Sequence, residues 1–204
     1  MSMILFHNPA SPFVRKVRVL LLETGQQDQV TLQVALVSPI SPVAELNDDN
    51  PLGKIPSLRL ADGTVLHDSR VILDYLDHQH DNAPLIPRDG PARWQRLTLA
   101  SVADGLMDAA VLVRYESAMR PAEKHWDLWL HEQRNKIRRT VDALEHTDLA
   151  GPFDIAAISV ACGLAYLDFR HPDLNWREGH PRLSAWYADV SQRPSMLATQ
   201  PPAV

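Results

Sequence analysis

Cysteine is nearly absent from this chain of 204 residues, which contains one, Cys162. A single cysteine excludes an intramolecular disulfide and a zinc site built from several cysteines. Excess positive charge is also absent, because 25 Asp and Glu outnumber 20 Lys and Arg and the formal net charge is −5. Such a balance creates no field that would attract nucleic acid or an anionic membrane surface. We therefore expect no nucleic acid and no membrane among the partners.

Long apolar runs and leader-like segments are absent as well. The first residues hold no basic stretch followed by a long apolar segment, so we expect a cytoplasmic protein without a targeting signal. The nine histidines are scattered, and none forms the i, i+4 pair with a carboxylate partner that zinc proteases use. No metal site is expected. Hydrophobic residues make up 45% of the chain, which suits one large domain or two small ones.

Strand and helix patterns alternate at the start of the chain. An apolar run from Met3 to His7 precedes a helical pattern from Pro12 to Glu23, which ends at Gly25. Alternation from Val30 to Leu36 predicts a second strand, followed by a loop with at most a short helix between Pro39 and Asn50.

A hairpin is predicted next, because two short strand patterns, residues 57–60 and 64–67, flank Asp62-Gly63. Helical spacing then returns from Val71 to Leu76. Residues 1–80 are thus expected to form an α/β domain with the element order βαβαββα.

The remaining sequence predicts helices only. Residues 81–90 are polar and rich in proline, which indicates a linker between domains. Long helical patterns follow over residues 91–118, 121–146, 154–169 and 181–192. Residues 91–204 are therefore expected to form an all-helical domain.

Ser11-Pro12-Phe13 lies where the first strand leads into the first helix. Ser11 suits the N-cap, and Pro12 suits the first helical position, where a backbone N–H is not needed. The Ser11 hydroxyl then lies beside N–H groups without intrahelical partners, at the positive end of the helix, and such a place favours an anion. A plain helix cap accounts for the same residues, so both interpretations stay open.

This domain order resembles that of the cytosolic glutathione transferases, whose N-terminal domain is thioredoxin-like, over nearly the whole chain. Ser11 stands where serine-type members hold the glutathione sulfur and where omega-type members have cysteine. The resemblance implies glutathione as co-substrate and Ser11 as the catalytic residue, with Phe13 beside it. Lowering a thiol pKa of about 8.5 by about 2 units requires roughly 2.7 kcal/mol. A hydroxyl donor and a helix N-terminus can supply this stabilisation.

Two further segments resemble glutathione-binding motifs. In Asn50 to Leu58 the family pattern implies a cis Pro56, with the Ile55 backbone pairing with glutathione; the alternative is a proline that begins an edge strand. Lys54 is expected to approach the glycyl carboxylate or to be solvated.

In His67-Asp68-Ser69-Arg70 the resemblance implies that Asp68 accepts from the γ-glutamyl ammonium and Ser69 donates to its carboxylate; the alternative is a simple N-cap.

Asp104 lies in Val102 to Asp108, which is similar to a pi-class segment whose Asp reaches the glutathione of the neighbouring subunit. The resemblance therefore implies a homodimer, and a solvated helix carboxylate is the alternative.

One departure from the family pattern is Asp154-Ile155-Ala156-Ala157, which has Ala where the family's helix-initiating box has a carboxylate. The residues expected near the second substrate are also explained by core packing: Phe13, Leu106, Met107, Ala110, Tyr115 and Tyr166.

The resemblance implies an enzyme that adds the glutathione thiolate to a small electrophile without a metal. A glutathione-dependent isomerase or peroxidase is an alternative, although zeta-class isomerases carry Ser-Ser-Cys where this chain has Ser11-Pro12-Phe13. Thiol transfer of the omega type is disfavoured, because Ser11 cannot form a mixed disulfide. A non-catalytic regulatory protein of the stringent-starvation type is the alternative from another class. Cys162 lies in an apolar run and is interpreted as a buried small hydrophobe.

Overall fold

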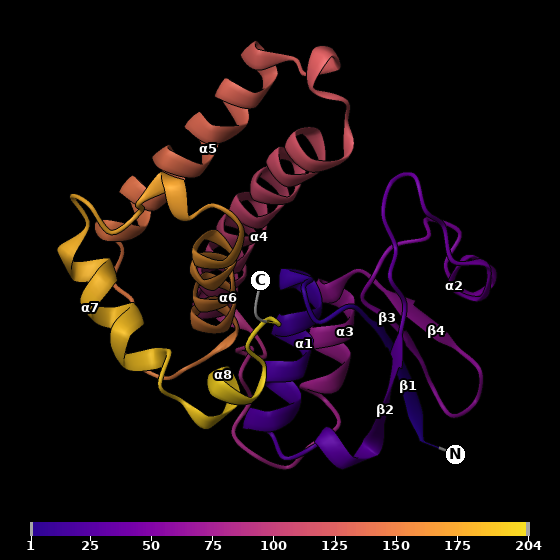
Figure 1. Cartoon of the computed structure of the whole chain (residues 1–204). Helices are drawn as coiled ribbons and strands as arrows, with labels where there is room; N and C mark the ends of the chain where they lie inside the picture. Colours follow the sequence, from indigo (N-terminus) through magenta and orange to yellow (C-terminus); the bar gives the residue numbers. More distant parts are fainter. Residues whose placement is uncertain (1, 203–204) are drawn as a thin grey trace. The chain divides into compact units, whose positions relative to one another are not determined.

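The computed structural model describes residues 2–202, which fall into two units. The first unit joins the chain up to Arg88 with the segment from Pro194 onward. The second unit spans Asp89 to Arg193. Figure 1 shows a sheet with flanking helices in the first unit and helices in the second. The predicted class, an α/β domain of order βαβαββα followed by a helical domain, is confirmed.

A four-stranded mixed sheet organises the first unit. Its strands are β1 (Met3–His7), β2 (Val30–Val34), β3 (Ser57–Arg59) and β4 (Val65–His67), in the spatial order β2-β1-β3-β4. The β1–β2 pair is parallel, and the β1–β3 and β3–β4 pairs are antiparallel. Gly63 allows the tight β3–β4 turn because its φ is +90°, a backbone conformation that glycine adopts without steric cost.

Helices cover both faces of this sheet. They are α1 (Pro12–Glu23), α2 (Ala44–Asp49) and α3 (Ser69–Leu76); a further helix of this unit, α8 (Pro194–Ala198), packs against α1. Figure 1 shows α1 and α3 on one side and α2 on the other. Phe6 packs with Leu46 of α2. Leu5 points to the opposite face because successive strand residues alternate, and it is fully buried there. Both faces of β1 therefore lie in the core.

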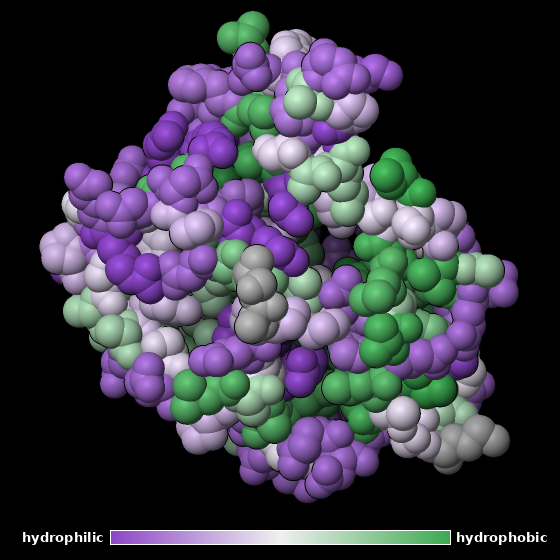
Figure 2. Space-filling model, viewed as in Figure 1, coloured by the Kyte–Doolittle hydropathy of each residue, from purple (hydrophilic) through white to green (hydrophobic). Residues whose placement is uncertain are grey.

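β2 is an edge strand and remains partly exposed. Its residues Leu32 and Val34, with Leu36 and Ile40 after it, are exposed apolar side chains. Figure 2 shows apolar residues gathered over this edge. The strand ends at Val34, two residues before the predicted end.

Two buried side chains hold distant segments of the first unit in place. The Arg15 guanidinium on α1 donates to the Met196 carbonyl at 2.9 Å, which fixes α8. Asp77, directly after α3, is 0% exposed and accepts from the N–H groups of Leu85 and Ile86 at 2.7 and 3.1 Å. The proline-rich segment after α3 is therefore tied down by a buried carboxylate.

The second unit is helical, with α4 (Gly90–Met119), α5 (Asp127–Glu145), α6 (Ile155–Arg170) and α7 (Pro181–Val190). α6 lies at its centre, and nearly all of its side chains are buried. Asp154 is the N-cap of α6 and accepts from Ala156 and Ala157 N–H at 3.0 and 3.1 Å. Arg96 pairs with the same carboxylate. The missing family carboxylate at Ala157 thus leaves the α6 cap intact.

Glu145, the last residue of α5, accepts hydrogen bonds from two N–H groups at the start of α7. Its two carboxylate oxygens accept from Arg182 N–H at 3.0 Å and Leu183 N–H at 2.8 Å. Burial alone would raise the Glu145 pKa, but these two donors and nearby positive charge lower it overall. In the part of the chain that the structure describes, no helix combines the length and apolar character needed to span a membrane.

Gly163 is the point of close contact between α6 and α4. A Cβ at Gly163 would lie 3.1 Å from Leu106 Cδ2, whereas a Cβ at Gly105 would meet nothing within 4 Å. We expect Gly163→Leu to lower the free energy of unfolding by about 1–3 kcal/mol through overpacking. Gly105→Ala is the matched control and should raise it by up to about 1 kcal/mol through helix propensity. Urea unfolding followed by circular dichroism measures both, and a stable Gly163→Leu variant would contradict this account of the α4–α6 contact.

Candidate functional site

The register of the sheet brings three chain segments to one edge. Phe6 of β1 pairs with Ser57 of β3, and Ser57 pairs with His67 of β4. β1 and β4 therefore end at the edge where β3 begins. The residues just beyond this row are the loop to Ser11, the Ile55-Pro56 pair and the Asp68-Ser69 pair. These are the three segments in which the sequence predicted a glutathione site, and the sheet places them along the same edge.

Ser11 is held at the start of α1 by its neighbours. Its N–H donates to the Asn8 carbonyl at 2.9 Å, and the Asn8 side chain accepts from Ala10 N–H at 2.9 Å. The Ser11 hydroxyl accepts from Val14 N–H at 3.3 Å, which makes it the N-cap. Its oxygen is therefore fixed at the positive end of α1, and its own proton is available for donation to an anion.

The segment before β3 is shaped by Asn50, which is buried. The Asn50 side chain donates to the Lys54 carbonyl at 2.9 Å and accepts from Leu52 N–H at 3.1 Å. The Ile55–Pro56 peptide bond is cis. Within residues 2–202 the N–H and C=O of Ile55 take part in no hydrogen bond. This backbone can pair with an extended ligand in the manner of an added strand.

Asp68 and Ser69 form the start of α3. Asp68 is the N-cap, and its Oδ1 accepts from Arg70 N–H at 2.9 Å. Its φ of 61° lies in the left-handed region, which is uncommon for a residue other than glycine. The Asp68 side chain is exposed, whereas Ser69 is 3% exposed. α3 therefore presents a carboxylate and a hydroxyl at the same edge as Ser11, beside the N–H groups of its first turn.

The other predicted site residues occupy different surroundings. Phe13 is half-buried on α1, with Lys16 Nζ 5.9 Å from its ring centroid. Lys54 is exposed in the loop before Ile55. Asp104 lies on α4 in the second unit and is 1% exposed, so it is not a solvated helix carboxylate.

His7 is a site neighbour that the sequence prediction did not include. It is the last residue of β1, it is 8% exposed, and its Nδ1 has no hydrogen-bond partner among the described residues. Burial lowers its pKa, and the charge of Arg18 lowers it further, so the imidazole is neutral at pH 7. Alternation along β1 is the sequence signal that would have placed His7 beside the sheet-facing side of α1.

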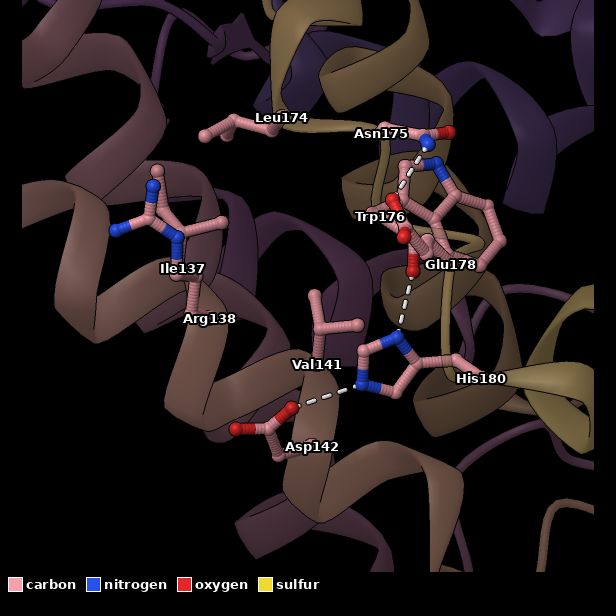
Figure 3. Close-up of a pocket in the computed structure, with 9 residues that line it drawn as sticks. All are labelled: Ile137, Arg138, Val141, Asp142, Leu174, Asn175, Trp176, Glu178 and His180. Atoms are coloured by element: carbon pink, nitrogen blue, oxygen red, sulfur yellow. Dashed lines mark hydrogen bonds and ion pairs between the residues drawn. The ribbon is translucent and has the colours of Figure 1, made fainter.

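A surface cavity of ≈ 250 Å³ lies elsewhere, in the second unit. It is bounded by α5 and by the segment from Leu174 to His180, and it contains none of the predicted site residues. In Figure 3 the His180 ring contacts Asp142 at 2.8 Å and the Trp176 carbonyl at 2.7 Å. These contacts join α5 to the segment that precedes α7. We interpret the cavity as a consequence of how α5 packs against this segment.

The candidate site offers the positive ends of two helices to an anion. Two helices of the first unit, α1 and α3, begin at the same sheet edge, so their positive ends add at one place. In the described residues, no three His, Cys, Asp or Glu side chains are grouped as metal ligands.

Comparison with known proteins gives the family. The model of the glutathione S-transferase N-terminal domain matches residues 5–84, and that of the C-terminal domain matches residues 127–189. The uncharacterized GST-like protein YibF of Escherichia coli K12 is 33% identical over 197 residues, which cover 94% of this chain and 95% of YibF. The chain belongs to the glutathione S-transferase family.

Solved structures of family members are closely similar to this chain. A glutathione transferase family member from Pseudomonas fluorescens Pf-5, crystallised with bound glutathione, is 68% identical with a TM-score of 0.98. The alignment covers 99% of this chain and 100% of that one. A second structure from the same organism, with bound S-(propanoic acid)-glutathione, is 66% identical with a TM-score of 0.93 and covers 98% and 100% of the two chains.

The cap interaction of Ser11 can be measured by itself. We expect Ser11→Ala to lower the free energy of unfolding by about 1 kcal/mol, because Val14 N–H loses its acceptor. Ser11→Asp should retain wild-type stability, since Asp is an equally good N-cap and its charge suits a helix N-terminus. Thermal and urea unfolding of the two variants test this. Equal stability of Ser11→Ala and Ser11→Asp would show that the cap contributes nothing.

Proposed function

We propose that this protein is a glutathione transferase that holds the glutathione thiolate at Ser11 and adds it to a small electrophile. The observation that carries the proposal is the position of the Ser11 hydroxyl, at the N-terminus of α1 and on the sheet edge shared with Ile55 and Ser69. A thiolate placed there receives a hydrogen bond from the hydroxyl and the favourable field of the helix. Both effects lower the thiol pKa.

Glutathione has a thiol between two charged ends, and the site offers groups that suit each part. The cysteinyl backbone pairs with the N–H and C=O of Ile55, next to Pro56, as an added strand. The γ-glutamyl carboxylate accepts from Ser69 and the first N–H groups of α3, while its ammonium donates to Asp68. Lys54 approaches the glycyl carboxylate.

The chemistry requires only the thiolate and an electrophilic carbon. For an alkene conjugated to a carbonyl, a sulfur–carbon bond forms, the π electrons move to the carbonyl oxygen, and the α-carbon then takes a proton from water. The thiol proton leaves to solvent when glutathione binds. No enzyme nucleophile or metal ion takes part, and Ser11 stays protonated as a donor throughout.

The relatives from Pseudomonas fluorescens support glutathione binding by this chain, because their structures hold glutathione and S-(propanoic acid)-glutathione at 68% and 66% identity. We propose further that the enzyme is a cytoplasmic homodimer in which Asp104 contributes to the glutathione site of the neighbouring subunit. In this proposal residues 1–80 bind glutathione, and helices α4 to α7 of the second unit bind the second substrate.

Two variants separate the catalytic role of Ser11 from its role as an N-cap. Ser11→Ala should lose most conjugating activity, with little loss of glutathione affinity, because the thiolate loses its donor. Ser11→Asp should be at least as inactive although it is stably folded, because its carboxylate repels the thiolate. The pKa of bound glutathione, read from ultraviolet thiolate absorbance, should rise in both variants.

Unchanged activity and an unchanged thiol pKa in Ser11→Ala would overturn this mechanism. Failure of the wild-type protein to bind glutathione at millimolar concentration would instead favour the non-catalytic alternative.

Asp68→Asn tests the proposed contact between Asp68 and the γ-glutamyl ammonium with a side chain of nearly the same shape. Asn caps a helix as well as Asp does and tolerates positive φ, so the variant should retain wild-type stability. Its glutathione affinity should fall about tenfold, because the hydrogen bond to the ammonium loses its charge. Calorimetric titration measures the affinity. Wild-type affinity in Asp68→Asn would remove Asp68 from the site.

A further inference from the structure

The Asn50 side chain forms two hydrogen bonds inside the loop before β3. Its Nδ2 donates to the Lys54 carbonyl at 2.9 Å, and its Oδ1 accepts from Leu52 N–H at 3.1 Å. A carbonyl can only accept and a backbone N–H can only donate, so these two partners determine which way the Asn50 amide points. Asn50 is 1% exposed, and its NH2 group therefore holds the Lys54 carbonyl toward the interior of the first unit.

The position of Asn50 itself is fixed by the core. Its N–H donates to the Leu46 carbonyl at 2.7 Å, and its own carbonyl accepts from Gly53 N–H at 2.8 Å. Leu46 is fully buried and belongs to the cluster of apolar side chains around Phe6. The donor that holds the Lys54 carbonyl is therefore tied, through the end of α2, to the core between α2 and the sheet.

The Lys54 carbonyl and the Ile55 N–H belong to one peptide unit. Its bond is trans, so the C=O and the N–H point in opposite directions, and a carbonyl held inward turns the N–H outward. In agreement with this direction, the Ile55 N–H has no hydrogen-bond partner within residues 2–202. The Ile55 side chain packs against the same cluster as Leu46, which holds the other end of the peptide unit. Asn50 thus fixes the direction in which the Ile55 N–H points.

Two effects of this arrangement favour a ligand carbonyl at the Ile55 N–H. A loop that is ordered in advance loses less conformational entropy when a ligand binds, so more of the hydrogen-bond energy contributes to affinity. In addition, the bond from Asn50 polarises the Lys54–Ile55 peptide, which makes its N–H a stronger donor. Both effects act on the Ile55 N–H, and therefore on the part of a ligand that accepts from it.

We propose that Asn50 is a positioning residue for glutathione: it directs the Ile55 N–H toward the cysteinyl carbonyl of the tripeptide and so selects ligands that carry this carbonyl. The inference rests on the proposed function, in which the cysteinyl backbone pairs with Ile55. Asn50 acts through the Lys54–Ile55 peptide and does not itself contact the ligand. Its contribution is to affinity, whereas in the same proposal Ser11 sets the pKa of the thiol.

Two ligands of equal net charge test the proposal. The glycyl ethyl ester of glutathione keeps the cysteinyl carbonyl, whereas γ-glutamylcysteamine lacks it and everything beyond it. In calorimetric titrations Asn50→Ala should bind the ester about tenfold more weakly than the wild-type protein does, and γ-glutamylcysteamine with an affinity within about twofold of the wild-type value. Asn50→Asp should behave in the same way, because it keeps an acceptor for Leu52 N–H and loses the donor to Lys54. Asn47→Ala, at an exposed position of α2, is the matched control and should change neither affinity.

Spectroscopy gives two further measurements. The pKa of the bound glutathione thiol, read from ultraviolet absorbance, should keep its wild-type value in Asn50→Ala, because Ser11 is intact. If both Asn50 variants fail to fold, nuclear magnetic resonance of the wild-type protein still tests the proposal. The Asn50 side-chain amide protons should be protected from exchange before any ligand is added. The Ile55 amide proton should shift downfield with the ester and not with γ-glutamylcysteamine.

The outcomes separate this inference from the proposed function. Equal weakening of both ligands in the Asn50 variants would mean that the whole loop is displaced and would overturn the positioning role, as would unchanged affinity for the ester or unprotected Asn50 amide protons. None of these results alters the assignment of the thiolate to Ser11. Conversely, full activity in Ser11→Ala with selective loss of the ester in Asn50→Ala would overturn the catalytic proposal and keep this inference. A wild-type protein that binds neither ligand nor glutathione would end both.

Discussion

The pairing of Phe6 with Ser57 and of Ser57 with His67 is the constraint on which the candidate site depends. Each site segment is a short loop whose own sequence does not fix its position. Because the three strands share one row of backbone pairs, the loops after β1 and β4 and the loop before β3 are brought to one edge. A slip of one residue in this register would also turn Leu5 and Phe6 to the wrong faces of the sheet. Core packing therefore fixes the geometry of the site.

The residues that begin two helices are also the residues to which we assign the chemistry. Ser11 completes the N-terminus of α1, and Asp68 completes that of α3. The Asp68 backbone conformation costs about 1–3 kcal/mol in general and is maintained by its bonds to Arg70 N–H and Ile72 N–H. A helix start exposes donors, so it needs a cap when the site is empty and can bind an anion when a ligand arrives. In the proposed function, capping and ligand binding are successive uses of one set of groups.

Local signals explain which parts could be predicted from the sequence. Ser11-Pro12 and Asp62-Gly63 act within a few residues, and α1 and the hairpin appear where these pairs predict them. The predicted helix start at residue 121 was wrong, because α5 begins at Asp127 after a separate turn, and Glu116 accepts from Trp126 N–H there. α8 depends on Arg15, far away in the sequence.

The bond from Arg15 to the Met196 carbonyl has a consequence for the order in which the chain folds during synthesis. Arg15 is 7% exposed, and a buried guanidinium without acceptors is costly. When the ribosome has completed the sheet and α3, the acceptors for this charge have not yet been made. The first unit therefore reaches its final form only after α7 has emerged and α8 follows it. The N-terminal part of the fold is therefore among the last to be finished. In a nascent chain that stops at Arg88, the Arg15 guanidinium on α1 is exposed and lacks its acceptor in α8.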